Sequence, residues 1–107
     1  VENAASLGPV LQRELASIRG EFPAVVGFAP AEGLVGGLLM VKPGTKEPNY
    51  DLAWDVVNGC FRRGLLLFAP VGVGGGCVKI APPLCINEEA LVEGCSVIRE
   101  ALREAVQ

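Results

Sequence analysis

Histidine is absent from the 107 residues of this chain, and its 4 cysteines show no CxxC spacing. Zinc sites are built from histidine and cysteine, most often in closely spaced pairs, so the sequence predicts no metal site. The cysteines also lack a nearby base that would activate a nucleophile, which favours core positions for them. A chain of this size sustains a core without a disulfide framework, so we expect free thiols and a reducing, cytoplasmic compartment. The thiols are those of Cys60, Cys77, Cys85 and Cys95.

Basic residues are fewer than acidic ones, and the net charge is −3. Nucleic acids and anionic membranes are therefore not expected as partners. Long apolar runs are scarce as well: none approaches the roughly 18 residues of a membrane span, and Lys42 ends the longest candidate. No signal peptide is visible, and the chain opens with Val1 in place of methionine, which is expected of a chain whose natural N-terminus lies upstream.

Hydrophobic residues, by contrast, make up 50% of the chain and charged residues only 20%. This composition excludes disorder, and the length predicts one domain spanning residues 1–107. It also indicates more apolar surface than one small domain can bury.

The most informative stretch runs from Gly64 to Leu91. Leu65–Phe68 is a short apolar run between glycine and proline, which predicts a buried strand. The glycine-rich segment Val71–Gly76 predicts a sharp turn, and Cys77–Ala81 predicts a second strand. Pro82 and Pro83 end that strand, because proline cannot donate a hydrogen bond to a β-ladder.

The sequence also predicts three amphipathic helices. The first either begins at Pro9 or kinks there, and it ends at Gly20. The second is capped by Asn49 and the third by Asn87, with the third running from Glu88 to Val106. The apolar faces are predicted to be Leu7, Leu11, Leu15 and Ile18; Leu52, Val56, Val57, Cys60 and Phe61; and Leu91, Cys95, Ile98, Leu102 and Ala105. On the third helix, the residues expected to face water are Glu93, Arg99, Glu100, Arg103 and Glu104.

Two further strands precede the second helix. Ala24–Phe28 lies between prolines, which confines it to a sheet edge or an extended linker. Gly33–Lys42 is a longer apolar run in which Gly36 and Gly37 mark a bulge or a close backbone approach. The order of elements predicts a two-layer α+β domain, with a small, mostly antiparallel sheet of three or four strands and helices on one face.

Lys79 is the residue that this arrangement singles out. Side chains alternate along a strand, so Val78 and Ile80 share one face, while Cys77, Lys79 and Ala81 share the other. If the first pair faces the helices, Lys79 is a lone cation on the opposite face of the sheet. Such a lysine is either an ordinary solvated cation or an anion-binding group.

Other motifs predict structure and not chemistry. VGVGGG resembles a phosphate-binding loop, but it lacks the GK[ST] ending and leads into a strand, so a turn is the better interpretation. Glu88 and Glu89 lie at a helix N-terminus, where their negative charges interact favourably with the positive end of the helix dipole. They are not expected to be a catalytic pair.

Three segments in combination resemble a known family. GLVGGLLMVKPGTKEP, CFRRGLLLFAP and VKIAPPLCINEEALVEG are similar to the C-terminal part of class III pyridoxal-phosphate-dependent aminotransferases, which include the 4-aminobutyrate, ornithine and acetylornithine enzymes. The resemblance covers nearly the whole chain. It implies the fold of the small C-terminal domain of a larger enzyme, docked against a large domain that carries the cofactor and most of a homodimer interface. It further implies pyridoxal phosphate in the full-length enzyme, an amino-acid or ω-amino-acid substrate, and no cofactor in this chain alone.

The resemblance assigns one site residue. In the family pattern [V/I]-R-x-x-P-P-L, the arginine grips a substrate carboxylate, and VKIAPPL places Lys79 at that position. Lysine offers a point charge and not a planar fork. Lys42 and Lys46 match no cofactor-lysine motif, so the sequence predicts no catalytic or cofactor-binding residue here. The segment GFAPAEGLVGG also departs from the family pattern V-R-G-x-G-L. The alternative is a stand-alone α+β module that binds a ligand or partner without catalysis.

Overall fold

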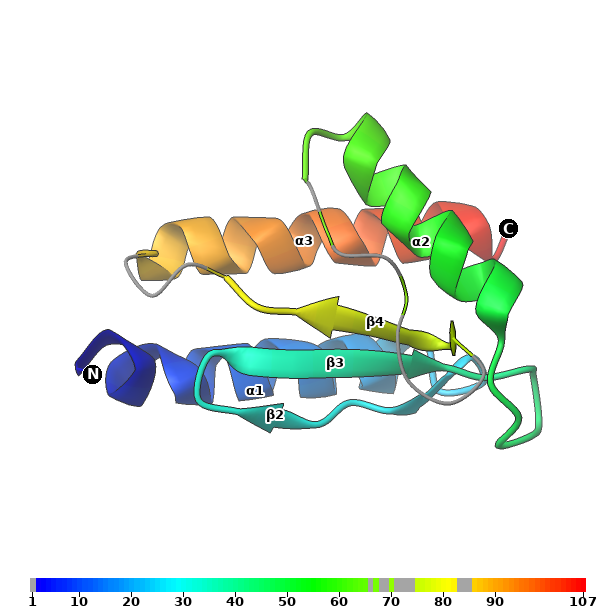
Figure 1. Cartoon of the computed structure of the whole chain (residues 1–107), viewed down its shortest axis with the longest axis horizontal. Coiled ribbons are helices and arrows are strands. Elements are labelled where there is room, and N and C mark those ends of the chain that lie inside the picture. Colours follow the sequence, from blue (N-terminus) through cyan, green and yellow to red (C-terminus); the bar gives the residue numbers. More distant parts are fainter. Residues whose placement is uncertain (1, 66, 68–69, 71–74, 83–85) are drawn as a thin grey trace.

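The computed structural model describes residues 2–65, 67, 70, 75–82 and 86–107. Within them, the chain forms three helices and four strands (Figure 1). The helices are α1 (Glu2–Glu21), α2 (Tyr50–Arg62) and α3 (Glu88–Ala105). The strands are β1 (Val26–Phe28), β2 (Ala31–Glu32), β3 (Val35–Met40) and β4 (Cys77–Ile80).

The sheet is organised around β3. On one side β3 pairs with both β1 and β2, and on the other it pairs with β4, always in antiparallel orientation. Helix α1 packs against β1, β2 and β3, whereas α2 packs against β3, β4 and α3. Figure 1 shows α1 lying along the sheet, and α3 packs against α1 and α2. The predicted two-layer α+β domain with a small antiparallel sheet is confirmed.

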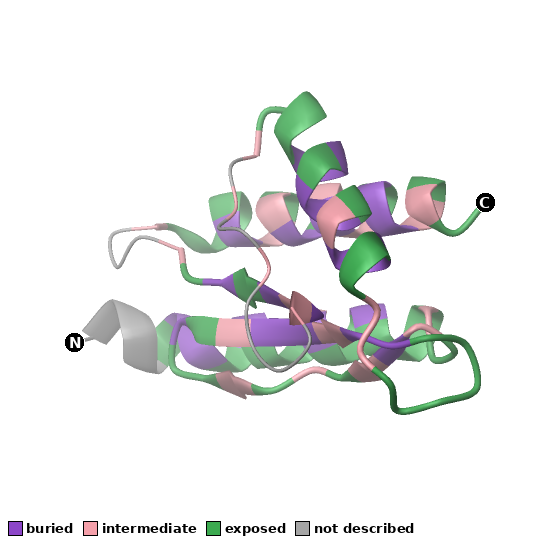
Figure 2. Cartoon of the chain, turned by 45° about the vertical axis from the view of Figure 1, so that its right-hand side comes forward, coloured by how far each residue is buried: buried purple, intermediate pink, exposed green. Residues whose placement is uncertain are grey.

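The core lies between the sheet and the helices. Figure 2 shows the buried stripe of each helix turned inward. On β3 and β4, alternate side chains enter this core, and those of Leu38, Met40 and Val78 are fully buried, with Ile80 only 5% exposed. The predicted stripe of α1, from Leu7 to Ile18, is buried as well.

Helix boundaries follow local chemistry closely. The side chain of Asn49 accepts a hydrogen bond from the backbone N–H of Leu52 at 3.1 Å, and Asn87 accepts one from Ala90 at 2.8 Å. Both residues have extended backbone conformations, as N-caps require. Helix α1 passes through Pro9 without ending, so the helix does not begin at that proline.

Four expectations need correction. Leu65 and Leu67 belong to no strand, and the rest of the predicted strand Leu65–Phe68 lies outside the described residues, as does most of the glycine-rich segment. Phe61 does not join the apolar face of α2, because its side chain is 67% exposed on the last turn. Ala24–Phe28 forms a strand only over β1, and the two-residue β2 was not predicted.

The fourth correction concerns the polar side of α3. Arg99 does not face water: its side chain is 17% exposed and lies against α1, where it pairs with Glu14 and Glu21. Arg103 also bonds Glu21, so the side of α3 predicted to be solvated is partly an interhelical charge network.

Candidate functional site

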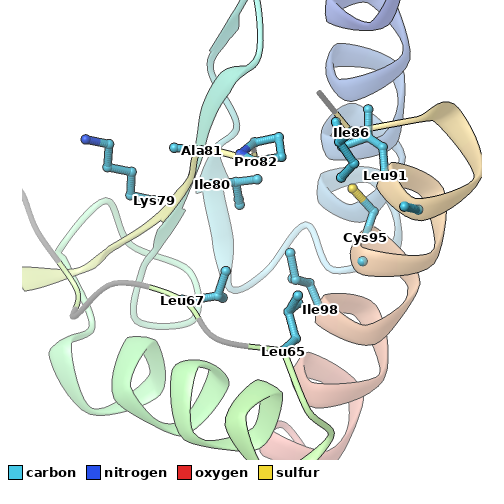
Figure 3. A pocket seen from close by; sticks show the side chains of 12 residues that line it. Leu65, Leu67, Lys79, Ile80, Ala81, Pro82, Ile86, Leu91, Cys95 and Ile98 are labelled. Atoms are coloured by element: carbon cyan, nitrogen blue, oxygen red, sulfur yellow. The ribbon is translucent and has the colours of Figure 1, made fainter. Parts of the chain in front are cut away.

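Lys79 lies on the sheet face that points away from the helices. Along β4 the burial alternates, since Val78 and Ile80 are buried and Lys79 is exposed. The predicted alternation is therefore confirmed. In Figure 3 the ammonium of Lys79 extends away from the strand on the side opposite Ile80.

The neighbours of Lys79 on this face are apolar or small. Antiparallel register places Gly37 directly opposite Lys79 and Leu39 opposite Cys77. On the far side of β3, Phe28 pairs with Leu39, and its side chain is 57% exposed. Val35, at the start of β3, is 52% exposed. We call this surface the open sheet face; Phe28, Val35 and Lys79 are exposed on it, Leu39 and Cys77 are half-buried, and Gly37 is buried.

Lys79 is the one basic residue in the four described strands, and Glu32 in β2 is the one acidic residue. The open sheet face thus combines exposed apolar side chains with a single cation. A second protein surface that covered it would exclude water from the ammonium. At about 4 Å, an opposite charge interacts with such a cation by about 4 kcal/mol near a protein surface and about 1 kcal/mol in bulk water. The face can therefore bind an anion more strongly when it is covered than when it is open.

Cys77 is a neutral thiol on the same face. Burial raises the pKa of the Cys77 thiol, and a backbone hydrogen bond from Leu38 lowers it by a smaller amount. A raised pKa leaves little thiolate at neutral pH, so Cys77 is not an activated nucleophile. Burial also raises the pKa of Cys60 and of Cys95 to about 11, as expected of core cysteines. All three are free thiols, and Cys85 lies outside the described residues.

A second feature is a pocket of about 170 Å³ between the end of β4 and α3. Ile80, Leu91, Cys95 and Ile98 line it, and Figure 3 shows these side chains converging on it. The lysine at its edge points its ammonium elsewhere. Binding sites for small molecules place a few polar groups among apolar walls, so this almost wholly apolar pocket is part of the core.

The sequence predicted the sheet face on which Lys79 lies, and the structure pairs Lys79 with Gly37 across the β3–β4 ladder. The pair Gly36–Gly37 was expected to mark a bulge or a close approach, but β3 and β4 pair in regular register across both residues. A close approach is therefore the correct interpretation. Within the part of the chain described, no group of His, Cys, Asp or Glu residues is placed to hold a metal ion.

Comparison with known proteins gives a consistent likeness. No protein-family model matches the chain. It is 32% identical over 98 residues to the diaminobutyrate–2-oxoglutarate transaminase of Wolinella succinogenes, covering 92% of this chain and 21% of that protein. It is 30% identical to the isoleucine 2-epimerase of Lentilactobacillus buchneri, covering 94% of this chain and 22% of that protein.

The fold agrees with this likeness. The structure of a Bacillus anthracis aminotransferase superposes with a TM-score of 0.84 at 30% identity, covering 96% of this chain and 24% of the other. The chain thus spans about a fifth of the length of the curated relatives it matches. None of the helices described has the length and apolar character needed to cross a bilayer.

Proposed function

We propose that this chain, which is similar to class III aminotransferases over nearly its whole length, forms the C-terminal small domain of a pyridoxal-phosphate-dependent aminotransferase. The likeness to a transaminase over 92% of the chain supports the proposal, as does the superposition on an aminotransferase structure. The same likeness disfavours a stand-alone binding module, because the matching proteins are about five times longer than this chain.

In this proposal Lys79 contacts an anionic group of the substrate. The observation that carries it is the position of Lys79 on the open sheet face, with its ammonium directed away from the helices. The rest of the enzyme, a large domain that precedes this one, would cover the face and exclude water from the contact. The ammonium would then hold one carboxylate oxygen at a time, because lysine lacks the planar fork that binds both oxygens.

The described residues do not themselves fit pyridoxal phosphate. Binding that cofactor requires a lysine for the Schiff base and partners for its ring nitrogen and phosphate. Lys42 instead pairs with Glu47 at 3.2 Å in an exposed loop, and Lys79 stands on the open sheet face. In the full-length enzyme, residues outside this chain would hold the cofactor. The cofactor would supply the electron sink for transamination. The role left to this domain is to bind and orient the substrate and to exclude water.

Two further proposals follow for the whole enzyme. The whole enzyme would be a homodimer with the large domain of each subunit at the common interface, as the resemblance to class III aminotransferases implies. A cytoplasmic location is supported by the free thiols of Cys60, Cys77 and Cys95, since an oxidising compartment favours disulfides.

The test is a substitution in the full-length enzyme, assayed with 2-oxoglutarate as the amino acceptor and L-2,4-diaminobutyrate as the first donor. Lys79→Met keeps most of the aliphatic stem and removes the charge. A hydrogen bond to a charged group contributes about 1.5–3 kcal/mol, so we expect KM for the anionic substrate to rise about tenfold or more. Lys79→Arg is the matched control, because it keeps the charge, and it should retain most of the activity. Unchanged KM in Lys79→Met would remove Lys79 from substrate binding.

A second candidate reaction is supported by one finding, the 30% identity to an isoleucine 2-epimerase along 94% of the chain. An epimerase inverts the α-carbon without transferring the amino group, and it therefore needs no acceptor acid. Incubation of the full-length enzyme with L-isoleucine, followed by chiral chromatography, separates the two reactions. Formation of the epimer without 2-oxoglutarate would assign epimerisation; amino transfer that requires 2-oxoglutarate would assign transamination.

A further inference from the structure

Glu32 projects from the side of the sheet that faces away from the helices. In the β2–β3 ladder it pairs with Val35, and directly paired residues share one face. The other residue of β2, Ala31, projects the opposite way. A Cβ atom added to its partner Gly36 would lie 3.5 Å from the Cβ of Ala31 and 2.5 Å from Cδ1 of Leu15 in α1. Glu32 therefore stands beside the open sheet face, and it is exposed there.

The carboxylate of Glu32 has no partner among the residues that the structure describes. None of the ion pairs formed there includes it, and it takes part in no hydrogen bond with them. The acids in the first turns of α2 and α3 are stabilised by the helix dipoles. A two-residue strand offers no comparable dipole, so the described residues do not account for an acid at this position.

Exposed apolar side chains adjoin this carboxylate. Val35, directly opposite Glu32, is 52% exposed, and Phe28 on the same face is 57% exposed. Exposed apolar surface of this kind marks a site of contact with another protein surface. A carboxylate that is covered together with such a surface loses its hydration, and this is unfavourable unless a cation replaces the water. The covering surface is therefore expected to carry a basic side chain opposite Glu32.

Glu32 and Lys79 lie on opposite sides of β3. Figure 1 shows β2 and β4 flanking β3, and adjacent strands are about 4.8 Å apart, so β2 and β4 are about 10 Å apart. The two charges have opposite signs and thus meet different parts of whatever covers the face. Docking in a wrong register would bring like charges together, which is strongly unfavourable.

We propose that Glu32 forms an ion pair with a lysine or arginine of the large domain of the same enzyme, and that this pair fixes the register in which the large domain covers the open sheet face. The inference rests on the proposed function, because it takes the large domain as the covering surface. The chain spans about a fifth of the length of the relatives it matches, so most of the enzyme lies outside it. Unlike Lys79, Glu32 contacts protein and not substrate.

The native thiol of Cys77 reports on this contact, because it lies half-buried on the open sheet face. Two strands and four residues separate it from Glu32, a distance of about 17 Å. The Debye length at physiological salt is about 8 Å, so a charge change at position 32 does not act on the thiol directly. Faster labelling of Cys77 in a Glu32 variant therefore means that the face opens more often.

The experiment compares Glu32→Gln and Glu32→Lys in the full-length enzyme at physiological salt. Cys77 is labelled with N-ethylmaleimide and quantified by peptide mass spectrometry, and Tm and KM are measured alongside. Glu32→Gln should speed labelling about threefold and Glu32→Lys about tenfold or more, which correspond to about 0.7 and 1.4 kcal/mol. Tm should fall in the same order, because reversal adds repulsion to the loss of the pair. Glu93→Gln and Glu93→Lys, at an exposed position of α3, are the matched controls and should change neither quantity.

Three results would overturn the inference. The first is labelling and Tm unchanged in both Glu32 variants. The second is a Glu32→Lys variant that behaves like the unchanged enzyme while Glu32→Gln self-associates, because a charge of either sign protects a sheet edge from pairing. The third is labelling that speeds up when the enzyme is diluted, which would assign the face to a second copy of the chain.

Lys79→Met separates this inference from the proposed role of the lysine. If Lys79→Met raises KM while both Glu32 variants match the unchanged enzyme, the ion pair is refuted and the substrate contact stands. If KM is unchanged in Lys79→Met while Glu32→Lys speeds the labelling of Cys77 more than Glu32→Gln does, the substrate contact is refuted and the ion pair stands.

Discussion

The guanidinium of Arg99 in α3 lies 3.2 Å from a carboxylate oxygen of Glu21 in α1. The same guanidinium lies 3.8 Å from Glu14 and donates a hydrogen bond to the hydroxyl of Ser17 at 3.4 Å. Its side chain is only 17% exposed, so these contacts are partly shielded from water. Arg99 therefore joins two helices that are distant in sequence.

Replacing Arg99 with methionine should destabilise the domain. The substitution keeps much of the apolar stem but leaves Glu14, which is 15% exposed, without its interhelical partner. Removing one member of a fully buried ion pair costs about 3–5 kcal/mol, whereas an exposed pair contributes less than about 1 kcal/mol. Because Arg99 lies between these limits, we expect the free energy of unfolding to fall by about 2 kcal/mol. Urea unfolding measures it. Arg103→Met, at a position 43% exposed, is the control and should cost clearly less. Equal losses would show that burial of Arg99 is not the reason for its contribution.

Acid should weaken the contact between α2 and α3. Arg63 and then Arg62 hold the pKa of the Glu104 carboxyl below its usual range, through bonds of 3.1 and 2.9 Å. Because the folded-state pKa is lowered, the stabilisation is present above the usual glutamate pKa of about 4.3 and is lost as the pH falls through the folded-state value.

Unfolding measured between pH 7 and pH 3 tests this expectation. Glu104→Gln should flatten the acid limb of the stability profile relative to the unchanged chain. Glu93→Gln, on an exposed position of the same helix, should leave the profile unchanged. An acid limb that is the same in Glu104→Gln and in the unchanged chain would contradict the assignment.

The core thiols should react slowly with alkylating reagents. With a pKa of about 11, Cys60 and Cys95 are about a thousandth thiolate at pH 8. Native-state labelling with iodoacetamide, read by peptide mass spectrometry, should modify Cys77 before either of them. Since the raised pKa values disfavour the charged form in the folded state, stability should fall as the pH rises from about 8.5 toward 11. Rapid modification of Cys60 or Cys95 in the folded chain would show that these sites open readily.

Local chemistry made the helix ends and the face of Lys79 predictable. Asn49 and Asn87 are caps because a short side-chain oxygen reaches a free N–H two or three residues on, a relationship set within one turn. The face of Lys79 follows from the period of two along a strand, which depends on neighbouring residues alone. The predicted likeness to class III aminotransferases is confirmed in the same way, from contiguous motifs.

Long-range pairing accounts for what could not be predicted. Nothing within Ala31–Glu32 identifies a strand, because these two residues are ordered by their pairing with β3. The register that sets Gly37 opposite Lys79 depends likewise on how two distant segments align. Arg99 has a sequence context typical of a solvated helix face, and only the approach of α1 turns it into an interhelical contact.

The caps themselves are open to a direct test on α2. Asn49→Ala removes the acceptor of the 3.1 Å bond from the N–H of Leu52 and should cost about 1 kcal/mol. Asn58→Ala is the matched control, since the same change at an exposed position within the helix replaces asparagine with a better helix former and should be neutral or slightly stabilising. Chemical denaturation of both variants gives the difference. If Asn58→Ala destabilised the chain as much as Asn49→Ala, loss of an asparagine and not loss of the cap would be responsible.

Gly36 offers a final test of how closely α1 approaches the sheet. An added Cβ atom would lie 2.5 Å from Cδ1 of Leu15 and 3.2 Å from the carbonyl oxygen of Pro30, a backbone atom that cannot rotate away. Leu15 is fully buried, so its side chain has little room to move, and overpacking of such a site costs about 1–3 kcal/mol. Gly36→Ala should therefore lower the free energy of unfolding by that amount. When Gly36→Ala is combined with Leu15→Ala, the loss in free energy of unfolding should be smaller than the sum of the two single losses, because the shortened side chain makes room for the methyl group. Strict additivity would show that the clash with the Pro30 carbonyl, and not the packing of α1, decides the requirement for glycine at this position.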